Sequence, residues 1–246
     1  MPADPPRLAG RIALITGASR GIGAAVAKRF AAEGAHVILV ARTVGALEEV
    51  DDAIRTMTGR SDCPATLVPV DLAEQGQIDV LGASIFQRFG RLDVLVGNAA
   101  MLGVLSPVAH SDPTHWQKVI ELNLNSNYRL IRSMDPLLRA SDAGRAIFVT
   151  ANVGHAVVPF WGAYAVSKAG LEMLVRLYAA EVAKTPVRAN ILDPGIVRTA
   201  MRARAFPGEA PDASPPPEAI AGRFVDLAEP AFTANGTLVH ATAEPE

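Results

Sequence analysis

The stretch Thr16-Gly-Ala-Ser-Arg-Gly-Ile-Gly23 decides the fold of this chain. It follows a short apolar run at residues 11–16 and precedes apolar residues at helical spacing, which Gly34 brings to an end. Glycines let the backbone turn sharply from a strand into a helix and approach a pyrophosphate, whose charge the helix N-terminus favours. The stretch therefore predicts a dinucleotide-binding turn. The alternative interpretation is a tight strand-to-helix connection without a ligand.

Strands and helices continue to alternate after this turn, and the second strand, at residues 37–40, is fully apolar, as in a parallel sheet covered on both faces. Further strands are expected at 66–70, 93–96, 146–150, 187–192 and 237–240, and helices at 21–33, 44–57, 75–89, 113–138 and 163–183. Right-handed crossovers then make an α/β fold: one Rossmann-like domain over residues 1–246 with a doubly wound parallel sheet and helices on both faces.

Two segments are expected to lie outside this regular pattern. Residues 1–7 form a flexible tail, and residues 200–225 form a substrate-loop region whose proline-rich part, 207–217, is neither helix nor strand. Ligands of such a sheet bind beyond the carboxyl ends of the strands, so the residues that follow each strand are the candidates for function.

Composition narrows the classes of partner. The chain has 246 residues, of which 50% are hydrophobic and 20% charged, and its formal net charge of −2 gives no general attraction for nucleic acid or an anionic membrane. The N-terminal residues do not resemble a secretion signal, and no apolar run reaches the roughly 18 residues of a membrane span, so we expect a soluble, cytoplasmic protein. Cys63 is the single cysteine, and we expect a buried, inert thiol.

The end of the second strand bears on the choice of nucleotide. NAD-binding proteins usually place an acid there, about twenty residues past the glycines, but this chain has Ala41 followed by Arg42. Arg42 and Arg20 would hold a 2′-phosphate by charge-assisted hydrogen bonds, which predicts NADP(H) in preference to NAD(H). The alternative is that both arginines are solvated surface charges. Asp71, after the third strand, either accepts a hydrogen bond from the adenine amino group or caps the next helix.

Tyr164 and Lys168 stand one helical turn apart in Tyr-Ala-Val-Ser-Lys. Hydride transfer to a carbonyl leaves an alkoxide that needs a proton, and a tyrosine supplies it when a nearby ammonium lowers its pKa from about 10. We therefore interpret Tyr164 as the acid/base and Lys168 as the residue that tunes it. In isolation the pair would equally fit a structural tyrosine beside a surface lysine.

The order of these motifs resembles the short-chain dehydrogenase/reductase family along almost the whole chain. The matching stretches are residues 16–23, Asp71-Leu72, Asn98-Ala99, Asn123, residues 164–168 and Pro194-Gly195. The resemblance implies interconversion of a carbonyl and an alcohol on a small molecule, with NAD(P)(H) and without metal, in a homo-oligomer, either a dimer or a tetramer, that packs the two long helices. It implies that Asn123 bends its helix and holds a water near Lys168. The cofactor-binding residues that it implies are Gly17, Ser19, Arg20, Gly21, Ile22, Gly23, Arg42, Asp71, Leu72, Asn98, Ala99, Tyr164, Lys168, Pro194, Gly195, Val197 and Thr199.

The chain departs from the family at one catalytic position. Thirteen residues before Tyr164, where the family carries a serine that stabilises the developing oxyanion, the chain has Ala151. Loss of one oxyanion donor costs about 3 kcal/mol. Thr150 is expected to point to the opposite face by strand alternation, so we interpret Asn152 as the substitute donor and count it with Asn123, Tyr164 and Lys168 as catalytic.

The residues expected to face the substrate are mostly apolar: Met101, Leu102, residues 155–161, Met201 and Phe206. They predict an apolar or aromatic carbonyl substrate, unless they are ordinary core side chains. Two hypotheses follow. The first is an NADP(H)-dependent carbonyl reductase or alcohol dehydrogenase. The second is a catalytically impaired nucleotide-binding protein with a regulatory or structural role, in which Ala151 marks lost chemistry.

Overall fold

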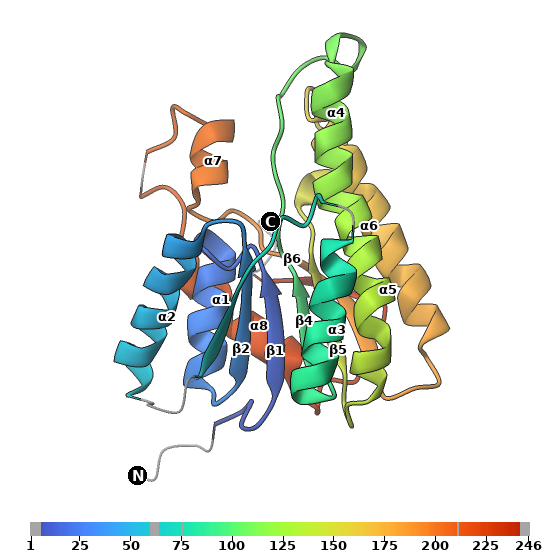
Figure 1. Ribbon diagram of the computed structural model, residues 1–246. Coiled ribbons are helices and arrows are strands. Elements are labelled where there is room, and N and C mark those ends of the chain that lie inside the picture. The colour runs from blue at the N-terminus through green and yellow to red at the C-terminus, as the bar shows by residue number, and fades with distance from the viewer. Residues whose placement is uncertain (1–5, 60–63, 75, 211, 242–246) are drawn as a thin grey trace.

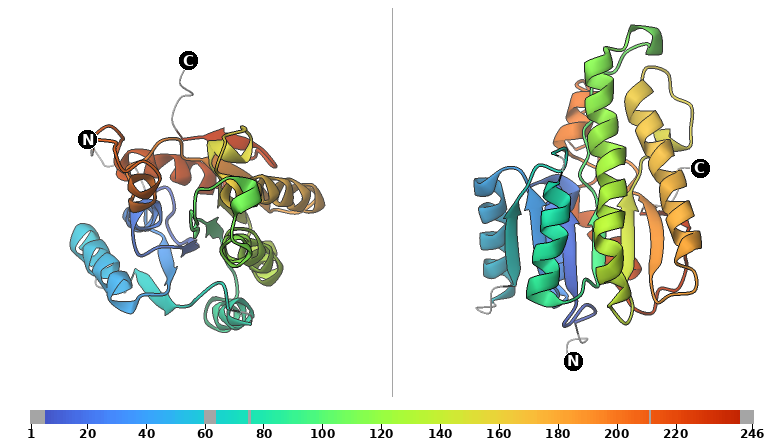
Figure 2. Two further views of the ribbon diagram at one scale, coloured as in Figure 1. Left: turned by 90° about the horizontal axis from the view of Figure 1, so that it is seen from above. Right: turned by 45° about the vertical axis from the view of Figure 1, so that its right-hand side comes forward.

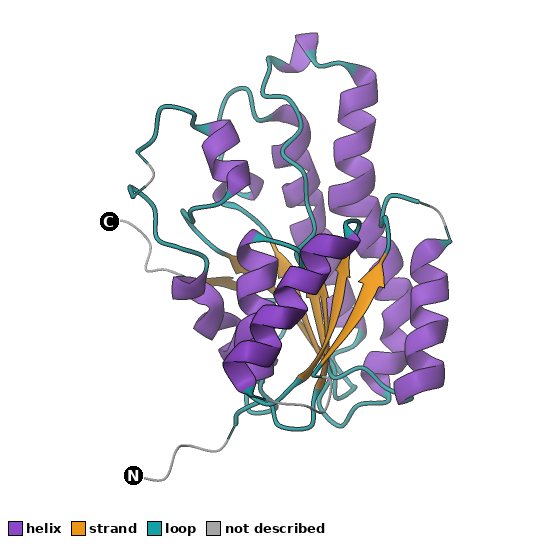
Figure 3. Ribbon diagram, turned by 60° about the vertical axis from the view of Figure 1, so that its left-hand side comes forward, coloured by secondary structure: helices purple, strands orange, loops and turns teal. Residues whose placement is uncertain are grey.

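The computed structural model describes residues 6–59, 64–74, 76–210 and 212–241. Within these residues one sheet of seven strands has the order β3-β2-β1-β4-β5-β6-β7, and every pair of neighbouring strands is parallel. The arrowheads that are visible in Figure 3 point to the same edge of the sheet. The strands are β1 (Ile12–Thr16), β2 (His36–Ala41), β3 (Ala65–Pro69), β4 (Val94–Gly97), β5 (Arg145–Val149), β6 (Arg188–Asp193) and β7 (Leu238–His240). This confirms the predicted doubly wound sheet.

Helices cover both faces of the sheet (Figures 1 and 2). On one face α1, α2 and α8 pack on the strands through a core that includes Phe30, Ile54 and Phe224. On the other face α3, α5 and α6 pack through Ile85, Leu130 and residues around them. The α-helices are α1 (Gly21–Ala32), α2 (Val44–Thr58), α3 (Gln77–Phe89), α4 (Pro113–Ile120), α5 (Ser126–Arg139), α6 (Gly162–Glu181), α7 (Ala200–Ala205) and α8 (Glu218–Ala228).

The C-terminal third contains two helices that were not among the elements expected from the sequence. The segment 200–225, expected to be a substrate-loop region, includes α7 and the first part of α8. Phe224 is fully buried, and α8 packs on α1 and β5, so this part of the segment belongs to the core. The described part of the proline-rich stretch, 207–210 and 212–217, is free of helix and strand, as predicted.

The helix expected at 113–138 is interrupted in its middle. A π-helical turn, η2 (Glu121–Asn125), joins α4 to α5, and Asn123 lies within it. One extra residue per turn shifts the faces of the helix, and such turns are frequent at functional sites. Short 3₁₀ turns also occur at η1 (Val108–His110) and η3 (Asn152–Gly154). The expectations for Cys63 and for most of the N-terminal tail lie outside the described residues.

Candidate active site

The glycine turn between β1 and α1 has a backbone that side chains would obstruct. Gly17 and Gly21 have φ angles of 66° and 56°, a region that favours glycine. A Cβ on Gly23 would lie 2.3 Å from the carbonyl oxygen of Gly17. Arg20, the N-cap of α1, makes no side-chain capping hydrogen bond. Its side chain therefore does not occupy the first backbone N–H groups of the helix, which can bind an anion. These observations fit the phosphates of a dinucleotide.

Thr16 links this turn to the loop after β4, a role that the sequence analysis missed. Its hydroxyl donates to the carbonyl of Val96 and accepts from the backbone N–H groups of Asn98 and Ala99 at 2.9 and 3.0 Å. The Asn98 side chain in turn donates to the Thr16 carbonyl at 2.8 Å. Two of the segments assigned to the cofactor are therefore held together by one buried threonine.

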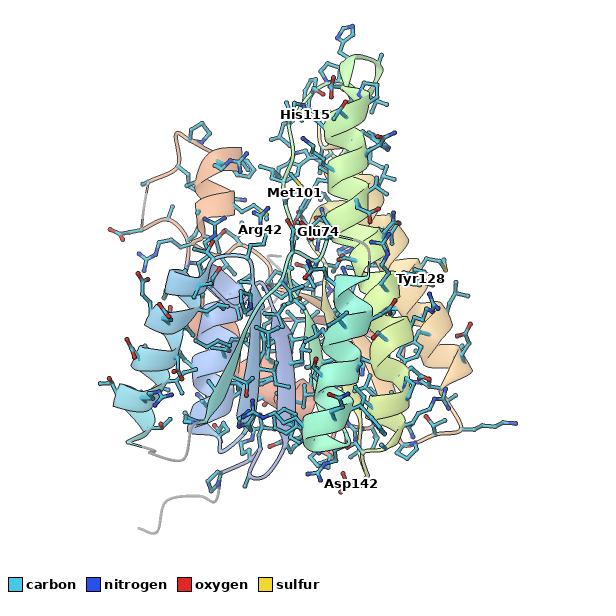
Figure 4. All side chains as sticks on the ribbon, viewed as in Figure 1. Arg42, Glu74, Met101, His115, Tyr128 and Asp142 are labelled. Carbon is cyan, nitrogen blue, oxygen red and sulfur yellow. The ribbon has the colours of Figure 1, made fainter. Side chains whose placement is uncertain are left out.

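The segments after β2 and β3 lie at the same edge of the sheet as the glycine turn, beyond the carboxyl ends of the strands. Arg42 is 72% exposed, and its guanidinium lies 3.7 Å from the carboxylate of Asp71. Figure 4 shows Arg42 above the carboxyl ends of the strands, where a ligand would approach. Asp71 accepts from the N–H of Ala73, whereas Gly76 is the N-cap of α3. The alternative interpretation of Asp71 as the cap of that helix is therefore wrong.

The segment after β6 reaches back to the glycine turn. Gly195 has a φ of 68°, and Pro194 and Val197 are buried. A Cβ on Gly21 would lie 3.6 Å from the Thr199 side chain, so this segment and the turn are neighbours. The Thr199 hydroxyl accepts from the N–H of Arg202 and caps α7. The other cofactor candidates near the turn, Ser19 and Ile22, are partly buried, and Leu72 is buried in the core.

Tyr164 and Lys168 lie on one face of α6 and are both buried, with exposures of 7% and 2%. The Lys168 ammonium lies 5.7 Å from the centre of the Tyr164 ring and donates to the carbonyl of Val149 at 2.7 Å. Burial and the negative charge of Asp193 raise the pKa of Tyr164 to about 12. Burial lowers the pKa of Lys168 to about 8, although the charges of Asp193 and Glu172 oppose it. The pKa of Tyr164 is thus shifted in the direction opposite to the lowering expected from Lys168, because burial dominates; the effect of Lys168 itself on the phenol stays a prediction.

Asn123 is fully buried in η2 and uses its whole amide. Its oxygen accepts from the N–H of Met101 at 2.8 Å, and its nitrogen donates to the Met101 carbonyl at 2.9 Å and to the Ser167 hydroxyl at 3.0 Å. The side chain thus joins the loop after β4 to α6. The helix is irregular at Asn123, as the resemblance implies, but in the structure its amide positions protein groups.

An apolar cluster surrounds Tyr164. Its buried members are Leu102, Val153 and Tyr164 itself, and its partly buried members are Leu105, Ala151, Trp161, Ala165, Met201 and Ala205. Trp161 lies 5.9 Å, centre to centre, from both Tyr164 and Phe206, so a residue next to α7 takes part in the wall. Figure 4 places Met101 at the same edge of the sheet.

The segment 155–161 only partly meets its expected role in the substrate site. Trp161 packs beside Tyr164, whereas Val157 is fully exposed. His155 turns toward Glu172, with its Nδ1 atom 2.9 Å from the carboxylate. The physical reason is that a buried carboxylate lies within reach, so the imidazole binds it in preference to the apolar side of the loop.

Ala151 lies in the apolar cluster with Tyr164, and its methyl side chain provides no hydroxyl beside the phenol. The Thr150 hydroxyl instead donates to Glu172 at 2.8 Å and is buried. Asn152 is exposed at the start of η3, next to Ala151. Its role as the substitute donor stays a prediction.

Two buried acids near Lys168 were missed as functional candidates. Glu172 is 2% exposed and Asp193 is 3% exposed. The spacing of Tyr164, Lys168 and Glu172, four residues each time, places all three on one face of α6 and was a usable signal. Asp193 ends β6, and only the tertiary structure brings it near α6.

Within the described parts of the chain, no group of three or more His, Cys, Asp or Glu side chains is arranged to hold a metal ion. Across the same residues, no helix combines the length and the apolar character needed to cross a membrane.

A doubly wound sheet with a glycine turn after β1 defines the Rossmann-like class of dinucleotide-binding proteins. A family model described as short chain dehydrogenase matches residues 11–210. The chain is 39% identical over 203 residues to the uncharacterized oxidoreductase YciK of Escherichia coli K12, an alignment that covers 82% of this chain and 79% of the relative. This chain therefore belongs to the short-chain dehydrogenase/reductase family and is an NAD(P)(H)-dependent oxidoreductase.

Solved structures agree closely with this fold. A short chain dehydrogenase from Shigella flexneri is 35% identical and superposes with a TM-score of 0.93, covering 98% of this chain and 94% of the other. A protein of the same class from Escherichia coli CFT073, solved in complex with NADPH, is 36% identical with a TM-score of 0.92, covering 98% and 99%.

Proposed function

We propose that this protein is an NADP(H)-dependent reductase of apolar carbonyl compounds. The same site would also catalyse the reverse reaction, oxidation of the alcohol. The observation that carries the proposal is Tyr164, buried in an apolar cluster at the edge of the sheet where the glycine turn also lies. Apolar walls favour apolar substrates because burial removes their surface from water. Membership of an oxidoreductase family favours this proposal over an impaired nucleotide-binding protein.

The nucleotide supplies hydride when it is bound, and the chain supplies the proton. With its pKa raised to about 12, the Tyr164 phenol is protonated at neutral pH and is suited to donate to an alkoxide. Lys168 would bind the ribose hydroxyls with its ammonium and lie beside the phenol. Asn123 would hold the loop after β4 against α6, as its hydrogen bonds to Met101 and Ser167 support. Asn152 would donate to the oxyanion in place of the missing serine.

The glycine turn, Arg20 and Arg42 would hold the nucleotide, with the two guanidinium groups on its 2′-phosphate. Support comes from Ala41 at the position where an NAD-binding acid would stand, and from the relative that was solved with NADPH. We expect Arg42→Ala to weaken NADPH binding about tenfold and to leave NADH binding unchanged. Arg132→Ala, an exposed arginine on α5, is the matched control in a fluorescence titration. Equal losses for both nucleotides would contradict the preference for NADP(H).

We also propose a homo-oligomer in the cytoplasm, composed of chains that each fold as one domain over residues 1–246. Exposed apolar side chains on the two long helices support the association: Tyr128 on α5, and Val166, Met173 and Leu177 on α6, are each 50–56% exposed.

The central test is turnover of a panel of apolar aldehydes and ketones with NADPH and with NADH. We expect Tyr164→Phe to lower kcat/KM for reduction at least about a hundredfold, because the proton donor is lost, and to leave NADPH affinity unchanged. Tyr128→Phe is the matched control, since Tyr128 lies exposed on α5. Undiminished reduction by Tyr164→Phe would remove Tyr164 from the mechanism.

A further inference from the structure

A buried carboxylate ties together both ends of the loop that follows β5. Glu172 Oε1 accepts from the Thr150 hydroxyl at 2.8 Å and lies 2.9 Å from Nδ1 of His155. Thr150 and His155 bracket the segment that contains Ala151 and Asn152. The Glu172 side chain of α6 therefore connects the two ends of this loop. The other side of the loop faces Tyr164.

The second nitrogen of His155 faces a second buried acid. Its Nε2 atom lies 3.6 Å from Oδ2 of Asp193, at the end of β6, and the His240 ring approaches the same oxygen at 3.9 Å. Asp193 Oδ1 accepts from the N–H of Gly195, which fixes the carboxylate. The imidazole thus lies between Glu172 of α6 and Asp193 of β6, and it connects the loop to both elements.

The packing around this cluster leaves little room for movement. A Cβ on Gly154 would lie 2.8 Å from Glu172 Oε1 and 3.0 Å from both the Lys168 Cβ and the Thr150 hydroxyl. Burial raises the pKa of Glu172, but hydrogen bonds from His155 and Thr150, with the charges of His155 and Arg176, outweigh burial and lower it. Arg176 contacts the other carboxylate oxygen at 3.2 Å. Glu172 is therefore held as a carboxylate with both oxygens engaged.

We propose that Glu172 and His155 are positioning residues for the substrate side of the active site. They hold the loop after β5 in place from beneath, so that Ala151 and Asn152 keep a fixed position relative to Tyr164. The inference rests on the proposed reductase function. The same cluster is also connected to Lys168. The Lys168 ammonium donates to the carbonyl of Val149, which is next to Thr150 in the chain. Small displacements of groups at a reaction centre cost up to about a hundredfold in rate.

The test separates positioning from mere stability. We expect His155→Leu to lower kcat about tenfold or more, with the NADPH dissociation constant within about twofold of the parent's. Amide hydrogen exchange in residues 150–155 should accelerate, because the link to both carboxylates is lost. His155→Arg supplies N–H donors for both acids, and we expect it to restore most of the rate. The matched control, His110→Leu, alters an exposed histidine on η1 and should change neither readout.

Glu172→Gln gives a second, independent variant that keeps the size of the side chain. It should reproduce both the loss of kcat and the faster exchange, whereas Glu181→Gln, at the exposed end of the same helix, should not. The inference would be overturned if folded His155→Leu and Glu172→Gln kept the parent's kcat and exchange rates, even with lower melting temperatures. If the parent protein turned over no carbonyl, the proposed function would fail, and the exchange comparison would still decide whether these residues hold the loop.

Discussion

Ala151 occupies the position at which the chain departs from the catalytic pattern of its family. The position lies in the apolar cluster with Tyr164, and a serine hydroxyl there is the oxyanion donor that the resemblance to the family implies. We expect Ala151→Ser to raise kcat for carbonyl reduction about tenfold or more in the Asn152→Ala variant, which lacks the proposed substitute donor, because one oxyanion donor is worth about 3 kcal/mol. In the parent the gain should be smaller, because Asn152 already donates. Steady-state kinetics check this, with Ala156→Ser in the exposed part of the same loop as the control. An equal gain in the parent and in Asn152→Ala would contradict the role of Asn152 as the substitute donor.

Lys168 should set the alkaline limit of the reaction. Burial lowers its pKa to about 8, so the ammonium predominates below that pH and is lost above it. Because the proposed mechanism uses the ammonium, we expect kcat/KM for reduction to fall as pH rises through about 8. Tyr164 loses its own proton only near pH 12 and cannot produce this limb. The residual activity of Lys168→Met should show no such limb, and a flat profile to pH 10 in the parent would refute the assignment.

At the scale of elements, helix α8 was not among the helices expected from the sequence. It follows the proline-rich stretch, and its Phe224 is fully buried against α1 and the sheet. We expect Phe224→Ala to lower the free energy of unfolding by about 3–5 kcal/mol, since it leaves a cavity. Urea unfolding measures the change. Phe86→Ala on α3, where the side chain is 65% exposed, should cost much less; equal costs would mean that α8 is not part of the core.

The π-helical turn η2 is a second element that pattern analysis did not predict. Periodicity at 113–138 indicated one continuous helix, because the π-helical turn is short and regular helix lies on both sides of it. The motif around Asn123 indicates this residue from the sequence alone. Its three hydrogen bonds, to Met101 and Ser167, depend on the packing of the loop after β4 against α6.

At the scale of the whole molecule, α5 and α6 lie side by side on one flank and carry exposed apolar side chains (Figures 1 and 2). We expect the parent to sediment as a dimer or tetramer and Leu177→Glu to shift it toward the monomer, because a charge would be buried in the interface. Analytical ultracentrifugation measures this shift. Val44→Glu, at an exposed site on α2, is the control. A parent that is monomeric at micromolar concentration would contradict the proposed assembly.

Local sequence determined the fold class, since an apolar run, a glycine turn and alternating periodicities depend on near neighbours in the chain. It also indicated Tyr164, Lys168 and the glycine turn as candidates for function, because their spacings are local. Tertiary structure alone decided the ionisation of the site and the partners of its loops. Burial raised the pKa of Tyr164, and Glu172, His155 and Asp193 are close together only because α6, the loop after β5 and β6 pack against one another. Desolvation and long-range contacts depend on the packed interior, which no spacing along the chain records.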